Sequence, residues 1–109
     1  MNVFIAQKMN GLSDEEIESV RQKTIEHVKR IYGEDVTFLD QFHLPDDVPD
    51  DVPSDRVRLH YLGRSIQILA KADIVVFAGD CSDAKGCLVE TAVCSLYDIP
   101  YLVFKGEDK

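Results

Sequence analysis

The sequence predicts an α/β domain of the flavodoxin or Rossmann-like kind: a three-layer sandwich in which a parallel sheet of about four strands lies between helices. Two observations predict it. Four short apolar runs alternate along the chain with three segments of helical periodicity, the usual pattern of strands joined by crossover helices. In the run at residues 73–78, every residue after Asp73 is apolar, as in strands covered on both faces. At 109 residues, the chain has room for one domain, residues 1–109.

The first strand is expected at residues 2–6 (NVFIA), and a long helix follows it. Ser13 and Glu16 have the S-x-x-E spacing of a capping box, which predicts the start of this helix. The helical pattern continues to about Tyr32, and Gly33 is the type of residue that commonly ends a helix. The apolar face of this helix is predicted at Ile17, Val20, Thr24, Val28 and Ile31.

A brief second strand at residues 36–39 leads into an acidic, proline-rich segment, residues 40–53. This segment contains Asp-Asp-Val-Pro twice in succession. Proline donates no amide hydrogen bond and neighbouring aspartates repel one another, so we expect an exposed loop. A lid over a site is the alternative, because long loops in compact domains are often functional. The glycine and terminal glutamate of a calcium loop are absent.

The second helix is expected to begin at Ser54 or Asp55 and to run to about residue 71. Its core stripe is predicted at Leu62, Ile66 and Leu69, with Tyr61 and Ile68 beside it. A third helix, residues 84–97, is expected to bury Leu88, Val89, Ala92, Val93 and Leu96. Glu90 falls off that stripe at 100° per residue. The last strand is predicted at residues 101–104, directly after a proline.

The predicted strand order, 2-1-3-4, places a topological switch point between the first and third strands. The loop at residues 7–11 then lies beside the loop at residues 79–86, and a ligand crevice is expected between them. Glu90, near the start of the third helix, is the candidate functional carboxylate at this crevice. The alternative is an acid that only complements the helix dipole.

Composition narrows the classes of partner. Acidic residues outnumber basic ones by 20 to 12, the net charge is −8, and no cluster of Lys and Arg is present. A nucleic-acid polymer or an anionic membrane surface is therefore not an expected partner. No apolar stretch reaches the ~20 residues of a membrane span and the N-terminus does not resemble a signal peptide, so a cytoplasmic location is expected.

The potential metal ligands do not form a recognisable site. Cys81, Cys87 and Cys94 contain no C-x-x-C pair, so free thiols are expected rather than zinc ligands or disulfides. The three histidines have no partner at a diagnostic spacing, and we expect surface or packing roles for them. No metal or organic cofactor is predicted.

Several segments together resemble the nucleoside 2-deoxyribosyltransferase-like superfamily. They are VFIAQKMNG, SIQILAKAD, IVVF, the pattern D-x-x-G-C-x-x-E, and IPYLVF. This superfamily includes nucleoside deoxyribosyltransferases and 2′-deoxynucleoside 5′-monophosphate N-glycosidases, and the chain is most similar to its small phage and prophage members. The resemblance covers nearly the whole chain apart from residues 40–53. It implies homodimers or larger homo-oligomers in which neighbouring subunits complete each site.

The resemblance implies a catalytic role for Glu90. In the family, the Glu of a Gly-Thr-x-x-Glu segment attacks the anomeric carbon of the sugar. Here Gly86 and Glu90 match that segment, with Cys87 in place of the threonine. A carboxylate can trap an oxocarbenium-like centre covalently, after which water completes hydrolysis or a second base completes transfer.

Two positions depart from the family. Phe4 replaces a tyrosine of the first strand, and Ser65 replaces an aspartate that contacts the sugar or helps to protonate the leaving base. A serine is a poor general acid at neutral pH. Asp80 or Asp83, in the loop before Glu90, could substitute for the missing acid, and spacing does not choose between them.

The expected ligand is a nucleoside or a nucleotide. Arg64 and the helix start after residue 84 favour a phosphate group, although Arg64 is equally interpreted as a solvated helix residue. The expected binding residues are Phe4, Ala6, Gln7, Met9, Arg64, Ser65, Gly79, Gly86 and Cys87. Two rival hypotheses remain: a protein that binds the ligand without cleaving it, and a module that mainly mediates self-association.

Overall fold

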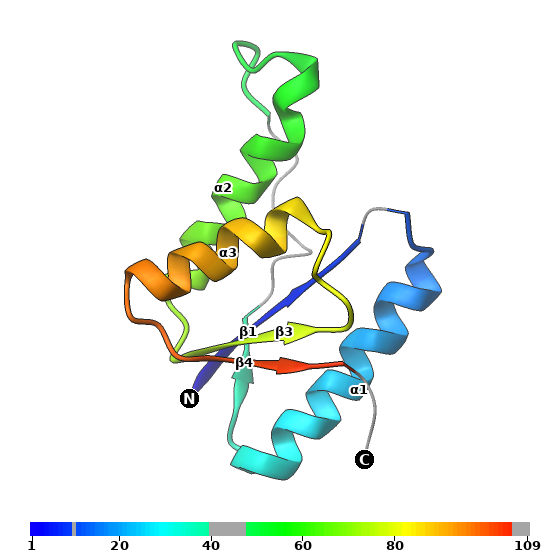
Figure 1. Cartoon of the computed structure of the whole chain (residues 1–109), viewed down its shortest axis with the longest axis vertical. Coiled ribbons are helices and arrows are strands. Elements are labelled where there is room, and N and C mark those ends of the chain that lie inside the picture. The colour runs from blue at the N-terminus through cyan, green and yellow to red at the C-terminus, as the bar shows by residue number, and fades with distance from the viewer. Residues whose placement is uncertain (10, 40–47, 106–109) are drawn as a thin grey trace.

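The computed structural model describes residues 1–9, 11–39 and 48–105 and confirms the predicted fold class. Its four strands pair in parallel in the order β2-β1-β3-β4, as the sequence predicts (Figure 1). The strands are β1 (Asn2–Gln7), β2 (Thr37–Phe38), β3 (Ile74–Ala78) and β4 (Tyr101–Phe104). The helices are α1 (Asp14–Tyr32), the short 3₁₀ turn η1 (Ser54–Arg56), α2 (Val57–Leu69) and α3 (Lys85–Leu96). None of the helices in these ranges is both long enough and apolar enough to cross a membrane.

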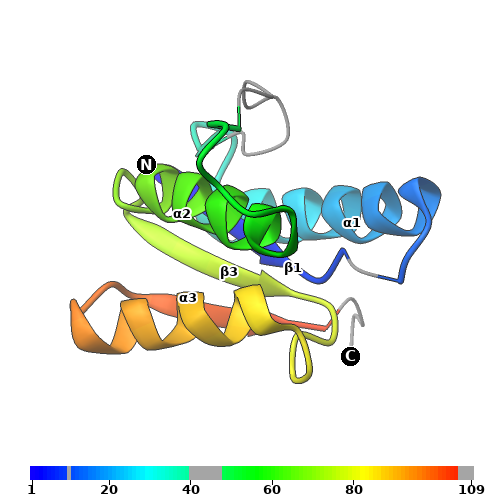
Figure 2. The same ribbon diagram turned by 90° about the horizontal axis from the view of Figure 1, so that it is seen from above.

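Helices cover both faces of the sheet. One face packs on α1 through Val3, Ile5, Val28 and Val76. The other packs on α2 and α3 through Phe4, Ala6, Leu69, Val75, Phe77, Cys87 and Cys94. Figure 2 shows β3 running between α2 and α3 in that view. Alternate residues of β1 therefore face different helices, as the two-residue period of a strand requires.

The beginning and the end of α1 agree with the sequence. Ser13 accepts a hydrogen bond from the Glu16 amide at 3.1 Å, and the Glu16 carboxylate accepts one from the Ser13 amide at 3.0 Å. Gly33 ends the helix with φ of 94°. Ile31, expected on the inner face, is 52% exposed. A helix of 19 residues extends roughly 28 Å, beyond the roughly 20 Å spanned by a six-residue strand, so its last turn passes the edge of the sheet.

The start of α2 differs from the prediction. Neither Ser54 nor Asp55 caps it, because both belong to η1 and the cap residue, Arg56, makes no side-chain hydrogen bond. Leu69 is the buried residue of this helix, whereas Leu62 and Ile66 are half-buried. Figure 1 shows the reason: only the C-terminal part of α2 lies on the sheet, and the rest projects beyond it.

The expected buried side of α3 is wrong except at Val93, which is half-buried and packs against the core, whereas Ala92 is exposed. Leu88, Val89 and Leu96 are 53%, 40% and 78% exposed. The buried residues are Cys87, Glu90 and Cys94. The helix is apolar around much of its circumference. Either of two stripes at helical spacing could therefore pack against the sheet: the predicted one, or the one that contains Cys87 and Cys94. The stripe with the smaller cysteine side chains is the one that packs.

The acidic segment is described in part. Residues 48–53 contain neither helix nor strand, in agreement with the predicted loop. The first part of that loop, residues 40–47, lies outside the described residues.

Candidate active site at the β1–β3 switch point

The carboxyl ends of β1 and β3 meet at the point where the strand order reverses. The two strands pair in register from Val3 with Ile74 to Gln7 with Ala78. Beyond them the loops are joined by Lys8 and Asp83, whose Nζ and Oδ2 atoms are 3.0 Å apart. Figure 1 shows the end of β1 and the beginning of α3 on the same side of the molecule. The predicted juxtaposition of the two loops is confirmed, and such a point is where open α/β sheets bind ligands.

Glu90 lies in the second turn of α3 with its side chain turned inward. It is 6% exposed. A Cβ atom added to Gly86 would lie 4.0 Å from Glu90 Oε1 and 3.7 Å from Leu62 Cδ1. Both distances are ordinary van der Waals contacts, and they place the carboxyl group beside the first turn of α3, in the region where α3 faces α2. Because the helix begins at Lys85, Glu90 is beyond the first turn, where an acid interacts most with the helix dipole.

Burial determines the protonation of Glu90. Loss of solvation raises the pKa of the carboxyl group to about 7, and negative charge on the nearby Cys81 sulfur adds to the increase. Within residues 1–9, 11–39 and 48–105, no group donates a hydrogen bond to Glu90. A buried acid without a hydrogen-bond partner costs stability, and a carboxyl group that titrates near neutral pH is suited to proton transfer or nucleophilic attack.

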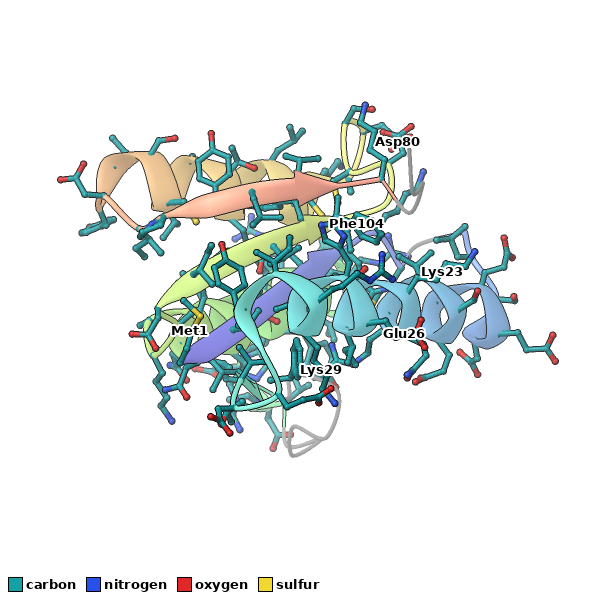
Figure 3. The ribbon with its side chains drawn as sticks, turned by 90° about the horizontal axis from the view of Figure 1, so that it is seen from below. Met1, Lys23, Glu26, Lys29, Asp80 and Phe104 are labelled. Carbon is teal, nitrogen blue, oxygen red and sulfur yellow. The ribbon has the colours of Figure 1, made fainter. Side chains whose placement is uncertain are left out.

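The two aspartates expected to assist Glu90 are engaged elsewhere. Asp80 Oδ1 accepts hydrogen bonds from the Ser82 hydroxyl at 2.7 Å and from the Ser82 amide at 3.1 Å. The hydroxyl bond is the main cause of its lowered pKa. Figure 3 shows Asp80 at the outer edge of its loop. Asp83 is paired with Lys8, and neither aspartate contributes to the raised pKa of Glu90. Their proposed role in proton transfer stays a prediction.

A thiol that the expected site does not include lies beside Glu90. Cys81 is half-buried in the loop after β3, and its Sγ atom is 3.4 Å from the Ala78 carbonyl oxygen. It also packs against the apolar cluster that contains the buried Cys87. The spacing of Cys81 and Cys87 across a predicted loop and the following helical turn is the one signal in the sequence that connects them. All three cysteines are free, as expected.

The expected ligand contacts on β1 do not lie together. Phe4 and Ala6 are fully buried in the core beneath α2 and α3. Gln7 points to the opposite face, where its Nε2 donates to the Ile17 carbonyl of α1 at 3.0 Å. Met9, 36% exposed, follows the strand.

The other expected contacts lie on elements around Glu90. Gly79, with φ of 72°, directly follows β3. Gly86 and the buried Cys87 form the first turn of α3. Arg64 and Ser65 are half-buried on α2, the helix that also carries Leu62.

An open depression of about 280 Å³ lies at the N-terminal end of α2, lined by Asp51, Val52, Pro53, Arg56, Leu59 and His60. None of these residues belongs to β1, β3 or α3. Among the described residues, no group of three or more His, Cys, Asp or Glu is arranged to hold a metal ion. Comparisons with known protein families, with curated proteins and with solved structures found no match for this chain.

Proposed function

We propose that this protein cleaves or transfers the N-glycosidic bond of a nucleoside or nucleoside 5′-monophosphate, with Glu90 as the nucleophile. The observation that carries the proposal is the buried carboxyl group of Glu90 at the β1–β3 switch point, with a pKa of about 7. The choice of reaction rests on the resemblance between the Gly86–Glu90 segment and the Gly-Thr-x-x-Glu segment of the deoxyribosyltransferase-like superfamily.

The chemistry follows from the environment of Glu90. Its ionised form attacks the anomeric carbon as the bond to the base breaks, and positive charge develops on the sugar. Desolvation makes the carboxylate less stable in the free protein, and an oxocarbenium-like centre beside it relieves that cost. Water or a second base then attacks the glycosyl intermediate and releases Glu90.

The test is base release from a panel of ribo- and deoxyribonucleosides and their 5′-monophosphates, followed by chromatography. We expect Glu90→Gln to reduce the rate by at least ~10³-fold, as loss of a nucleophile does elsewhere. Glu18→Gln, on the exposed side of α1, is the matched control and should retain the rate. Unchanged base release by Glu90→Gln would contradict the mechanism.

The pH dependence of kcat/KM tests the role of Glu90 separately. A nucleophile must be ionised, so the rate should rise with pH through about 7, where Glu90 titrates. A rate that falls through the same pH would instead make Glu90 a general acid, contrary to the proposal.

A binding protein that leaves its ligand intact is the second candidate. The observation that favours it is the engagement of Asp80 with Ser82 and of Asp83 with Lys8, which leaves Glu90 without an aspartate partner among the described residues. Equilibrium dialysis with the same panel separates the two candidates. Saturable binding with full recovery of the ligand supports binding alone, whereas released base supports the enzyme.

Self-association is the third part of the proposal. The resemblance implies homo-oligomers, and exposed apolar residues of α3, its C-cap and β4 offer a surface for a second copy. They are Leu88, Leu96, Tyr97, Tyr101 and Val103. Light scattering should give a mass above the 12.3 kDa of one chain. Leu96→Arg should lower that mass, whereas a monomeric wild-type protein would refute this part.

A further inference from the structure

The two edges of the sheet are formed by strands of different length. β2 is an edge strand of two residues, whereas β4, at the other edge, has four. Figure 3 shows β4 at the border of the sheet, with β3 between it and β1. Natural sheets protect their edges with very short strands, charged side chains, prolines or bulges. β4 (YLVF) contains neither a charged residue nor a proline, and its register with β3 is continuous.

The backbone of β4 is hydrogen-bonded on one side. The carbonyl groups of Pro100 and Phe104 accept hydrogen bonds from β3 and from the residue after it, at 3.0 and 2.8 Å. Because the sides alternate along a strand, Leu102 also bonds to β3, and Tyr101 and Val103 direct their amide and carbonyl groups away from it. In the part of the chain that the structure describes, no residue bonds to these outward groups. Such groups are a template for another strand.

The side chains along this edge are apolar and exposed. Tyr101 and Val103 are 43% and 57% exposed. They lie on the face that α2 and α3 cover, since the Tyr101 ring meets Phe77 of that face edge-on, with 5.4 Å between the ring centroids. Leu96 and Tyr97, at the end of α3 and its C-cap, are exposed as well. The edge therefore has apolar side chains both on β4 and just before it.

The distribution of charge indicates which partner this edge fits. Acidic residues outnumber basic ones by 20 to 12 over the chain, so two copies repel each other across most of their surfaces. Residues 86–104 contain only two charged residues, Glu90 and Asp98, and Glu90 is buried. A second copy can therefore approach this edge without bringing many acidic groups together.

We propose that β4 pairs with β4 of a second copy in antiparallel orientation, which joins the two sheets into one. The pairing rests on the proposed self-association and specifies where the two copies meet. A two-fold axis at Leu102 lets Tyr101 of each copy and Val103 of the other exchange both of their hydrogen bonds. An aromatic side chain then faces a β-branched one, which is a favourable cross-strand pair. The same register brings Lys105 of each copy beside Asp98 of the other, so opposite charges meet at both ends.

The two-fold axis reverses the strand direction between the copies. The carboxyl ends of β1 and β3 then point to opposite ends of the joined sheet, so each copy keeps its own candidate site. A pair of four-residue strands buries less area than a stable dimer needs, and the exposed residues at the end of α3 add to the contact. Glu90 takes no part in the pairing, which is therefore tested separately from the proposed N-glycosidase reaction.

The outward amide of Val103 offers a direct test. Val103→Pro removes this amide, which the fold of one chain does not use, and proline is tolerated in edge strands. We expect light scattering to give about twice the 12.3 kDa of one chain for the wild type, and the mass of one chain for Val103→Pro at the same concentration. Val103→Thr keeps the amide and the β-branched shape, so this matched control should remain a dimer.

Hydrogen exchange in the wild type tests the pairing without any variant. At concentrations where the dimer forms, the amides of Tyr101 and Val103 should exchange at least ~10-fold more slowly than in the dilute monomer, because both are then hydrogen-bonded. The Leu102 amide bonds to β3 in either state, so it is the internal reference and should change less.

Cysteine substitution tests the register. Leu102→Cys places two thiols opposite each other at the axis, with Cα atoms about 4.5 Å apart in a non-hydrogen-bonded pair, within the reach of a disulfide. We expect oxidised glutathione to link these chains. Val103→Cys faces Tyr101 of the other copy rather than a second thiol, and should stay unlinked.

The outcomes separate the pairing from self-association itself. A wild-type protein that stays monomeric contradicts both. A dimer that Val103→Pro leaves intact, or in which the Tyr101 and Val103 amides exchange as fast as in the monomer, overturns the pairing alone and leaves association through α3. Linkage of Val103→Cys in place of Leu102→Cys overturns the proposed register.

Discussion

Replacing Glu90 by glutamine should stabilise the protein, and the gain should depend on pH. The folded-state pKa of Glu90 is about 7, against an ordinary value of 4.5. Between these two pH values the folded chain holds a proton that the unfolded chain has released. The free energy of unfolding therefore falls as the pH rises from about 4.5 to about 7, and the contribution of Glu90 stays lost above that.

The size of the effect follows from the two pKa values. Their difference corresponds to about 3 kcal/mol between the lower and the upper end of this pH range. Glutamine has nearly the same shape and no charge, so Glu90→Gln removes this loss. We expect wild type and variant to be about equally stable near pH 4, with the variant up to ~3 kcal/mol more stable at pH 8. At roughly 4 °C per kcal/mol for a domain of this size, the Tm would rise by about 12 °C.

Urea unfolding at a series of pH values from 4 to 8 measures the effect as the difference between the two proteins. Glu18→Gln, exposed on α1, controls for the loss of one negative charge from a chain of net charge −8. Parallel stability curves for wild type and Glu90→Gln would refute the reasoning, since they would mean that Glu90 titrates alike in the folded and unfolded chains.

Three further predictions concern the elements around the site. Ser13→Ala removes one half of the capping box with Glu16 and should cost about 1 kcal/mol in urea unfolding; no loss would mean that the box does not stabilise α1. Gly79→Ala places a Cβ at φ of 72° and should cost about 1–2 kcal/mol in thermal unfolding, and unchanged stability would contradict that conformation. The exposed Lys8–Asp83 pair should show a coupling below about 1 kcal/mol in a double-mutant cycle. That coupling should vanish in 1 M salt, and persistence there would indicate a buried pair.

Much of the fold could be predicted because strong local signals agreed with one another. The capping box at Ser13, the glycine at 33 and the apolar runs each marked an element, and alternation with right-handed crossovers restricted the strand order. The second helix was harder, because Ser54 and Asp55 are good capping residues that the chain uses in a 3₁₀ turn. Side-chain preference alone does not say which of two adjacent turns begins the helix.

The site was predicted less completely. Glu90 was identified, but its burial was not, because Leu88 and Leu96 define an equally regular stripe and hydropathy favours burying them. The packing of Cys81 against the cluster that contains Cys87 depends on how the loop folds, which no local pattern specifies. By contrast, the face of the sheet toward which the Gln7 side chain points could have been predicted. It shares the parity of Val3 and Ile5, which face α1, and a strand alternates its faces strictly.

The central position of β1 has a consequence for how the chain folds. The Asn2 amide donates to the Asp73 carboxylate, across 71 positions of sequence, and β1 pairs along its length with β3. During synthesis, β1 therefore stays unpaired on this side until most of the chain, including β3, has been made. Pairings of such long range close slowly, and until β3 arrives the apolar edge of β1 is open to other chains. Refolding yield should accordingly fall with protein concentration more steeply than equilibrium stability suggests.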